Sequence, residues 1–251
     1  DRCQMAIENR ASEENGGFGE IYANNVTVKN AGNRNIFSWG GVCNISNSTL
    51  YPSQGYSVYI RGGSAVLDSV KILGTIKETS GGLAVGSTIY KDPVVTIKGN
   101  TEITGCASRG IINYNKLTIY DCNIHDNNTS GKLTSGVGIY SVGDVYMHGG
   151  KIHDNYGTKY GAGIRLDRND KEKLIGNLYM YGGSIYDNEA GISGGGVSVA
   201  EKCVFEMRGG SIYNNRGAVR GDGMVISGTF NLYDAERIGE NDIYLTEGNK
   251  I

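Results

Sequence analysis

The sequence predicts an all-β protein, a single-stranded parallel β-helix (solenoid) of about nine or ten coils with three short strands per coil. Three observations support this fold class. The segment "MYGGSIYDN" at Met180 recurs as "MRGGSIYNN" at Met207, and apolar residues alternate within it. Glycine supplies 40 of the 251 residues and proline only 2. A helical solenoid needs apolar residues at three- and four-residue spacing, which this glycine-rich repeat lacks.

An apolar marker residue in "GGSIYDN" defines the repeat. Clear equivalents are Ile124, Ile152, Ile185 and Ile212, at intervals of 28, 33 and 27 residues. Weaker copies place further markers at Val26, Leu50, Ile72, Ile103 and Ile238. A period between 20 and 50 residues is typical of solenoids, so each repeat is expected to form one coil.

Each repeat contains three strand signals. An alternating segment such as Leu178-x-Met180 comes first, a short strand surrounds the marker, and "GGGVSV"-like segments form the third. A strand buries one face, so inward residues of successive coils should stack into apolar columns. Glycines are expected at the corners, where the chain needs positive φ, and proline is rare because the N–H groups pair between coils.

The chain ends are less regular than its middle. Residues 1–251 are predicted as one domain, with an atypical first coil or cap at 1–25 and a terminal coil at 239–251. The first residue is Asp1, so we expect a fragment of a larger modular protein.

Three segments depart from the regular coil. The segment from Ile7 echoes the repeat from Ile185, which we prefer to a helical cap over residues 1–14. Two coils carry extra residues after the third strand, from Gly86 and from Asp167. Both insertions should therefore leave the same corner of the solenoid, where functional loops are common.

Composition excludes several classes of protein. The net charge of −2 gives no basic field for nucleic acid, and no apolar run is long enough for membrane insertion. The cysteines are scattered without a CxxC pair, so we expect small buried residues and no zinc or redox site. They are Cys3, Cys43, Cys106, Cys122 and Cys203.

The "GG-x-I-x-x-N" pattern followed by "GGG-[IV]" resembles the Gly/Asn-rich repeats of bacterial cell-surface β-helix proteins. These belong to the pectate-lyase-like right-handed β-helix superfamily, which includes adhesin-type repeats. The resemblance is strongest over residues 116–230. It implies a right-handed coil and an extracellular bacterial protein, secreted or attached to the cell surface and covalently linked to other domains. The superfamily includes lyases, hydrolases and adhesins, so fold alone does not choose the activity.

The candidate ligand-binding residues are rings expected on the outside of the coils. The chain has 17 tyrosines but only 4 phenylalanines. The set is Tyr120, His125, Tyr146, His148, His153, Tyr179, Tyr181, Tyr186 and Tyr213. Exposed rings with polar groups suit sugar faces and protein partners, although stacking that only protects the backbone ladder is the alternative. We therefore predict a non-catalytic, adhesin-like module that binds a glycan or a host surface protein.

A column of carboxylates supports the rival hypothesis of an enzyme. Asp126, Asp154 and Asp187 would lie about 5 Å apart on neighbouring coils, as in a retaining glycosidase. They would make the chain a polysaccharide lyase or glycoside hydrolase, and a structural spacer is the third hypothesis. No basic residue recurs beside them, so solvated turns and no catalysis are expected. No cofactor or metal is predicted, although calcium could bridge these oxygens.

Asparagine follows each marker by three residues. The column is Asn127, Asn155, Asn188 and Asn215. These amides could bind a ligand, or they could bond the turn backbone and each other inside the coil, and we favour the internal ladder.

Overall fold

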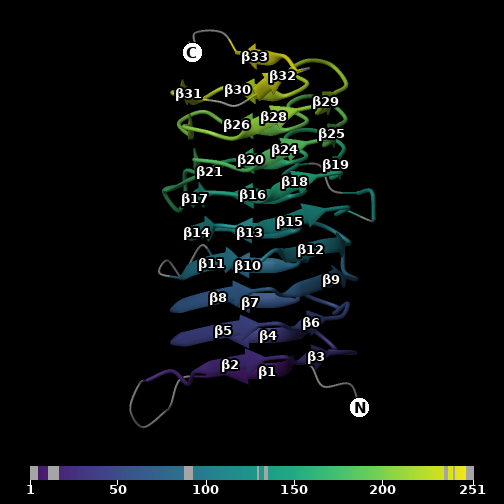
Figure 1. Ribbon diagram of the computed structural model, residues 1–251, viewed down its shortest axis with the longest axis vertical. Helices are drawn as coiled ribbons and strands as arrows, with labels where there is room; N and C mark the ends of the chain where they lie inside the picture. The colour runs from purple at the N-terminus through teal and green to yellow at the C-terminus, as the bar shows by residue number, and fades with distance from the viewer. Residues whose placement is uncertain are drawn as a thin grey trace.

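In a computed structural model, the chain winds into a rod of stacked coils (Figure 1). The structure describes residues 5–10, 17–87, 93–128, 130–132, 135–234, 237–239 and 241–246. Nine coils each contribute one strand to each of three parallel sheets, and β33 adds a tenth strand to one of them. The predicted fold class is confirmed. No helix occurs in the described ranges, and Met5–Asn9 is a strand, not part of a helical cap.

Each sheet takes one strand from each coil. Sheet I contains β1 (Met5–Asn9), β4 (Arg34–Ser38), β7 (Val58–Ile60), β10 (Leu83–Val85), β13 (Ile111–Asn113), β16 (Ile139–Ser141), β20 (Ile164–Leu166), β26 (Val197–Val199), β30 (Met224–Ile226) and β33 (Ile243–Leu245). Sheet II contains β2 (Ile21–Asn24), β5 (Val42–Ser46), β8 (Ser64–Asp68), β11 (Val94–Lys98), β14 (Lys116–Ile119), β17 (Asp144–Met147), β23 (Asn177–Met180), β27 (Val204–Met207) and β31 (Thr229–Leu232). Sheet III contains β3 (Thr27–Val28), β6 (Thr49–Leu50), β9 (Lys71–Thr75), β12 (Thr101–Cys106), β15 (Cys122–His125), β18 (Lys151–His153), β24 (Ser184–Tyr186), β28 (Ser211–Tyr213) and β32 (Arg237–Gly239).

Two small sheets lie outside this framework. The strands β19 (Tyr156–Gly157), β25 (Glu189–Ala190) and β29 (Arg216–Gly217) pair in parallel after the turns that follow sheet III. The longer insertion forms an antiparallel hairpin of β21 (Arg168–Asn169) and β22 (Leu174–Ile175). Helices able to cross a membrane are not found in the described part of the chain.

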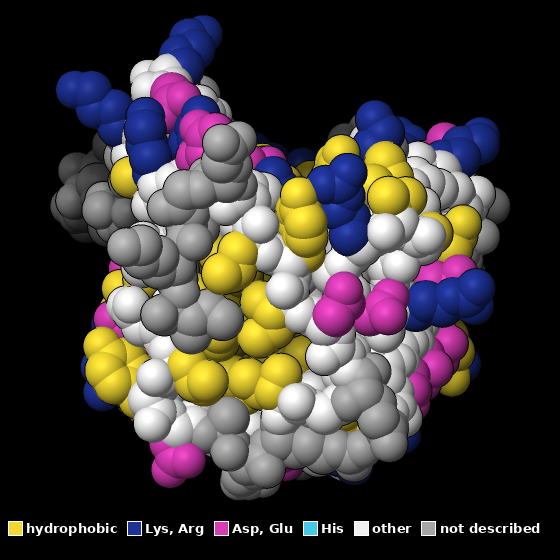
Figure 2. Space-filling view, turned by 90° about the horizontal axis from the view of Figure 1, so that it is seen from above, with side chains coloured by type: hydrophobic (Ala, Val, Ile, Leu, Met, Phe, Trp, Pro, Cys, Tyr) yellow, Lys and Arg dark blue, Asp and Glu magenta, His cyan; other side chains and the backbone are white. Residues whose placement is uncertain are grey.

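The marker residues form one inward row, as predicted. Ile124 pairs with Ile152, Ile152 with Ile185, and Ile185 with Ile212, and all four are fully buried. Similar rows from sheets I and II fill the rest of the core. Seen from above, hydrophobic side chains gather inside the last coil (Figure 2). The alternating pattern therefore fixes which face of every strand is buried.

The first coil differs from the prediction in two places. The residue that pairs with Leu50 is Val28, so the marker predicted at Val26 was wrong by two positions. Val26 occupies the corner position, where its N–H bonds to the hydroxyl of Ser48 in the next coil. Ile7 lies in sheet I opposite Ile36, so its alignment with the marker column was also wrong. The marker was misplaced because Val26, at the corner, is as apolar as Val28 in the strand.

Glycine is required at the corners between sheets II and III. Gly150, Gly183 and Gly210 have φ of 89°, 90° and 86°. A Cβ on Gly183 would lie 2.7 Å from the carbonyl oxygen of Gly150 in the coil below. Both the positive φ and the close approach of neighbouring coils therefore exclude a side chain there.

Asparagine forms the predicted internal ladder after sheet III. Each amide Nδ2 donates to the Oδ1 of the next coil, at 3.0 Å from Asn127 to Asn155, from Asn155 to Asn188 and from Asn188 to Asn215. The four residues are at most 4% exposed, so they are structural and not ligand amides. Asn155 Nδ2 also donates to the carbonyl oxygens of Ile124 and His153.

The four cysteines that the structure describes are buried, as expected, and all four are free thiols. They are Cys43, Cys106, Cys122 and Cys203. Burial raises the pKa of the thiols of Cys43, Cys106 and Cys122 to about 12, so these thiols are protonated and unreactive at neutral pH. Cys3 lies outside the described residues.

Candidate functional site

The rings singled out in the sequence form three separate stacks, not one ridge. The first stack joins Tyr120, His148 and Tyr181, the second joins His125, His153, Tyr186 and Tyr213, and the third joins Tyr146 and Tyr179. Neighbouring centroids lie between 4.8 and 5.1 Å apart, with interplanar angles from 2° to 14°. The coil rise of about 4.8 Å sets this distance, which suits offset ring stacking.

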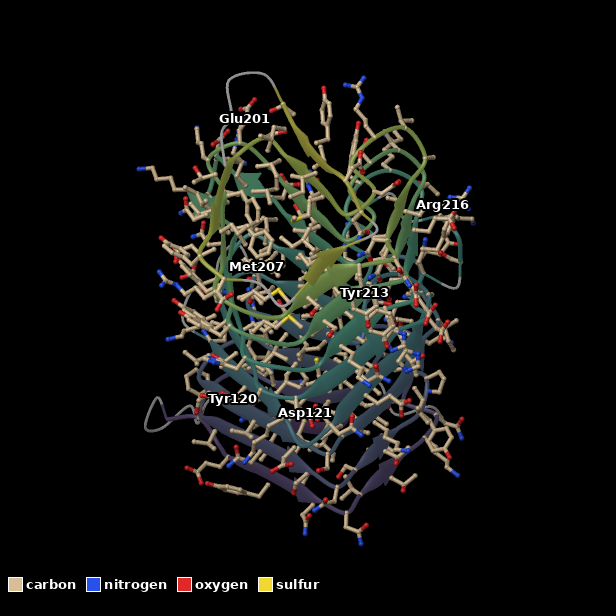
Figure 3. The ribbon with its side chains drawn as sticks, turned by 45° about the horizontal axis from the view of Figure 1, so that its top comes forward. Tyr120, Asp121, Glu201, Met207, Tyr213 and Arg216 are labelled. Carbon is tan, nitrogen blue, oxygen red and sulfur yellow. The ribbon has the colours of Figure 1, made fainter. Side chains whose placement is uncertain are left out.

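Stacking changes what the rings can offer to a ligand. Inner rings cover each other's faces, so they present their edges and polar atoms to solvent and not the open faces that we expected. Tyr120 and Tyr181 remain 54% and 42% exposed at the first stack. The imidazoles of His125 and His153 are only 16% and 14% exposed. Figure 3 labels Tyr120 and Tyr213, one from each of the first two stacks.

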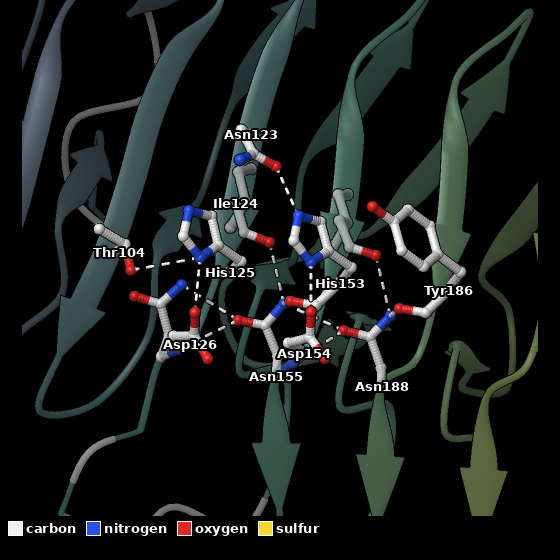
Figure 4. A network of polar contacts seen from close by, with 12 residues as sticks. Thr104, Asn123, Ile124, His125, Asp126, His153, Asp154, Asn155, Tyr186 and Asn188 are labelled. Atoms are coloured by element: carbon white, nitrogen blue, oxygen red, sulfur yellow. Dashed lines mark hydrogen bonds and ion pairs between the residues drawn. The ribbon is translucent and has the colours of Figure 1, made fainter.

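Both histidines of the second stack have both ring nitrogens engaged. Figure 4 shows the contacts of both nitrogens of His153 and those of Nδ1 of His125. His125 Nδ1 lies 2.7 Å from Asp126 Oδ2, and its Nε2 lies 3.3 Å from Glu102 Oε1. His153 Nδ1 lies 2.6 Å from Asp154 Oδ2, and its Nε2 lies 2.6 Å from Asn123 Oδ1. Neither imidazole therefore has a free nitrogen with which to hold a metal ion. No group of three or more metal-ligating side chains was found among the residues described.

The three aspartates of the proposed acid column share a backbone conformation. Asp126, Asp154 and Asp187 have φ of 51°, 49° and 51°, and Asn214 follows them with φ of 53°. Asp and Asn tolerate this left-handed conformation better than most residues, which accounts for their recurrence at this turn. All three carboxylates are exposed on the turn after sheet III.

A groove lies along the corner between sheets II and III. Its volume is about 550 Å³, within the usual range of ligand sites. Its lining residues are Asn100, Asp121, Cys122, Asn123, Gly149, Gly150, Lys151, His153, Gly183, Ser184 and Tyr186. Tyr120 and His148 of the first stack directly precede the lining residues Asp121 and Gly149. His153 and Tyr186 of the second stack line the groove themselves.

Polar groups of several kinds converge on this groove. Asp121 supplies a carboxylate, Lys151 an ammonium group and Ser184 a hydroxyl, over a floor of glycine backbone. Burial raises the pKa of Tyr186, so its phenol is neutral and can donate a hydrogen bond. The groove can therefore both donate and accept hydrogen bonds along its length.

The groove residues between the stacks were not predicted from the sequence. Asn123, Lys151 and Ser184 each precede a marker by one residue, so alternation points them outward. They pair in register, Asn123 with Lys151 and Lys151 with Ser184. The residue type at this position differs from coil to coil. Only its place, one residue before the marker, could have indicated that these side chains share a surface. Tyr146 and Tyr179 lie on sheet II, and neither they nor the three aspartates line the groove.

Three parallel sheets wound into a rod, with a groove along one corner, define a parallel β-helix that presents an elongated surface. A family model described as "Right handed beta helix region" matches residues 34–233, and the chain belongs to this family. Searches of curated proteins and of solved structures found no match.

Proposed function

We propose that the chain is a non-catalytic module of an adhesin-type extracellular bacterial protein that holds a glycan in the groove between the first two ring stacks. The observation that supports this function is the groove itself. It extends from Asn100 in the fourth coil to Tyr186 in the seventh. Three coil rises give it a length of about 14 Å, which suits a short stretch of an extended polymer.

The chemistry of the groove suits sugar hydroxyls, which donate and accept hydrogen bonds. Asp121 offers an acceptor, and the Asn123 amide, Lys151 and Tyr186 offer donors. Ring edges from the two stacks add apolar contact beside these groups. The β-ladders hold these side chains rigidly, so little ordering entropy is lost on binding.

The carboxylates support a non-catalytic role. Glycoside hydrolases use a pair of carboxyl groups that face each other across the bond they cleave. Asp121 is the only carboxylate among the residues that line the groove. Asp126 and Asp154 lie on the turn after sheet III. Their carboxylates contact the imidazoles of the preceding residues, His125 and His153.

A glycan array tests the proposal. Replacing Lys151 or Asn123 by alanine should reduce binding about tenfold, since each removes a hydrogen bond from the groove. Tyr146→Ala is the matched control, because Tyr146 lies on sheet II outside the groove. Unchanged binding in Lys151→Ala, or an equal loss in Tyr146→Ala, contradicts the proposed site.

The same protein is assayed against a panel of polysaccharides for new reducing or unsaturated ends. The proposal predicts no release. Release that is lost in Asp154→Asn would establish the enzyme hypothesis instead.

A further inference from the structure

The outer face of sheet I, which is not one of the two sheets that border the groove, carries arginines stacked on aromatic rings. The guanidinium of Arg34 lies 5.2 Å from the ring centroid of Tyr59, that of Arg61 lies 4.0 Å from Trp39, and that of Arg109 lies 4.6 Å from Tyr140. We call these six residues the arginine–aromatic face. Cation–π contacts of this length hold the guanidinium groups in fixed positions.

Arg34 and Arg109 occupy equivalent places on the sheet. The strands β4, β7, β10 and β13 are successive levels of sheet I (Figure 1). Ile36, Val58, Leu83 and Ile111 pair in one row across them. Arg34 and Arg109 each lie two residues before their member of that row, so they stand three coils, or about 14 Å, apart along the rod.

Glu8 and Asp167 act on the charges of Arg34 and Arg109 from a distance, but within the described residues no carboxylate bonds directly to either guanidinium. Neither Arg34 nor Arg109 forms an ion pair among the residues that the structure describes, and the Nε of each is buried without a hydrogen-bond partner. At each end of the face a carboxylate bonds to one of the rings. Glu8 accepts from Trp39 Nε1 at 2.8 Å, and Asp167 accepts from the Tyr140 hydroxyl at 3.2 Å.

Half-buried guanidinium groups without an acceptor are energetically unfavourable. Burial lowers the pKa of both Arg34 and Arg109, which reflects lost hydration of the charge. The buried Nε atoms are out of reach of another molecule, but a partner carboxylate can accept hydrogen bonds from the two terminal Nη groups in the two-pronged geometry that suits arginine. The face therefore has the form of a site whose anionic partner comes from another molecule.

We propose that the arginine–aromatic face docks an extended acidic segment of a partner protein. Arginine, tryptophan and tyrosine are the residues that dominate protein–protein contacts. The rings of Trp39, Tyr59 and Tyr140 each have a guanidinium over them, which leaves less open ring face for a sugar. In an extended peptide, residues i and i+4 point to one side about 13 Å apart, close to the separation of Arg34 and Arg109.

The fluorescence of Trp39, the single tryptophan of the chain, reports directly on this face. The probe is a 13-residue peptide of glycine, serine and threonine with two glutamates four residues apart, and its control carries glutamines instead. The glutamate peptide should change the fluorescence of Trp39 in a saturable way, and added salt should weaken its binding. Arg34→Gln and Arg109→Gln should each weaken binding about tenfold or more.

Arg208→Gln is the matched control, because Arg208 pairs with Glu206 at 2.9 Å on sheet II and should not affect peptide binding. Thermal unfolding by circular dichroism checks that each variant folds. Arg34→Lys provides a milder variant, because it keeps the positive charge but loses the two-pronged geometry of the guanidinium. Equal binding of the glutamine peptide, or full binding by folded Arg34→Lys and Arg109→Gln, overturns the proposal. So does a response of Trp39 to polygalacturonate but not to the peptide. Lys151→Ala should bind the peptide normally, which separates this site from the glycan groove.

Discussion

Asparagine 155 shows how one buried amide can connect three coils. Its Nδ2 donates to Ile124 of the coil below and to Asn188 Oδ1 of the coil above. Its Oδ1 accepts from the backbone N–H and the side chain of Asn127. Because the turn backbone is buried here, these groups have no water to replace a lost partner. The ladder therefore stabilises the turn and fixes the register between coils.

Asn155→Ala should lower the free energy of unfolding by about 3 kcal/mol, because it leaves several buried polar groups unpaired. Asn231→Ala on the outer side of β31 is the comparison, with an expected change within about 0.5 kcal/mol. Urea denaturation measures both. Equal effects of the two substitutions would show that the ladder contributes no special stability.

At the level of the strands, sequence periodicity predicts well which residues are buried. It predicts poorly which outward residues come together on one surface. The marker row from Ile124 to Ile212 follows from alternation and spacing, because an inward position admits only apolar residues. Val28 was missed because Val26, at the preceding corner, is equally apolar. Outward positions have no such constraint, so Lys151 and Asn123 share a groove without sharing a residue type.

The ring columns illustrate the same limit. Sequence spacing placed His125, His153 and Tyr186 in one column, which the structure shows. Spacing alone did not show that rings about 4.8 Å apart cover one another's faces. The equivalence of Arg34 and Arg109 could not be read from the sequence for another reason: they share no motif, and only the register of sheet I places them in equivalent positions three coils apart.

Ile152 tests the contribution of a single strand to the core. Ile152→Ala should cost about 3 kcal/mol of stability, because the side chain is fully buried between Ile124 and Ile185 and the rigid ladders cannot close the cavity. Ile175→Ala is the matched control on β22, where the side chain is 41% exposed. Its expected effect is within about 0.5 kcal/mol, and a comparable loss at both positions contradicts the assigned inward row.

In the whole molecule, the coil repeat arranges both the stabilising contacts and the outward side chains along the axis of the rod. Each coil pairs with the coil above and the coil below, so the core is continuous along the rod. The same repeat sets the spacing of every outward group, from the stacked rings to the two arginines of sheet I. The two sites that we propose lie on different sides of this rod and are held at fixed spacings by the same ladders.

The most direct measurement is a crystal structure of the chain with the oligosaccharide that binds best on the glycan array. We expect sugar density at the corner between sheets II and III, flanked by Tyr181 and Tyr186 and within hydrogen-bond distance of Lys151. Sugar bound instead over the Tyr146–Tyr179 stack, or against the carboxylate of Asp154, would contradict this expectation.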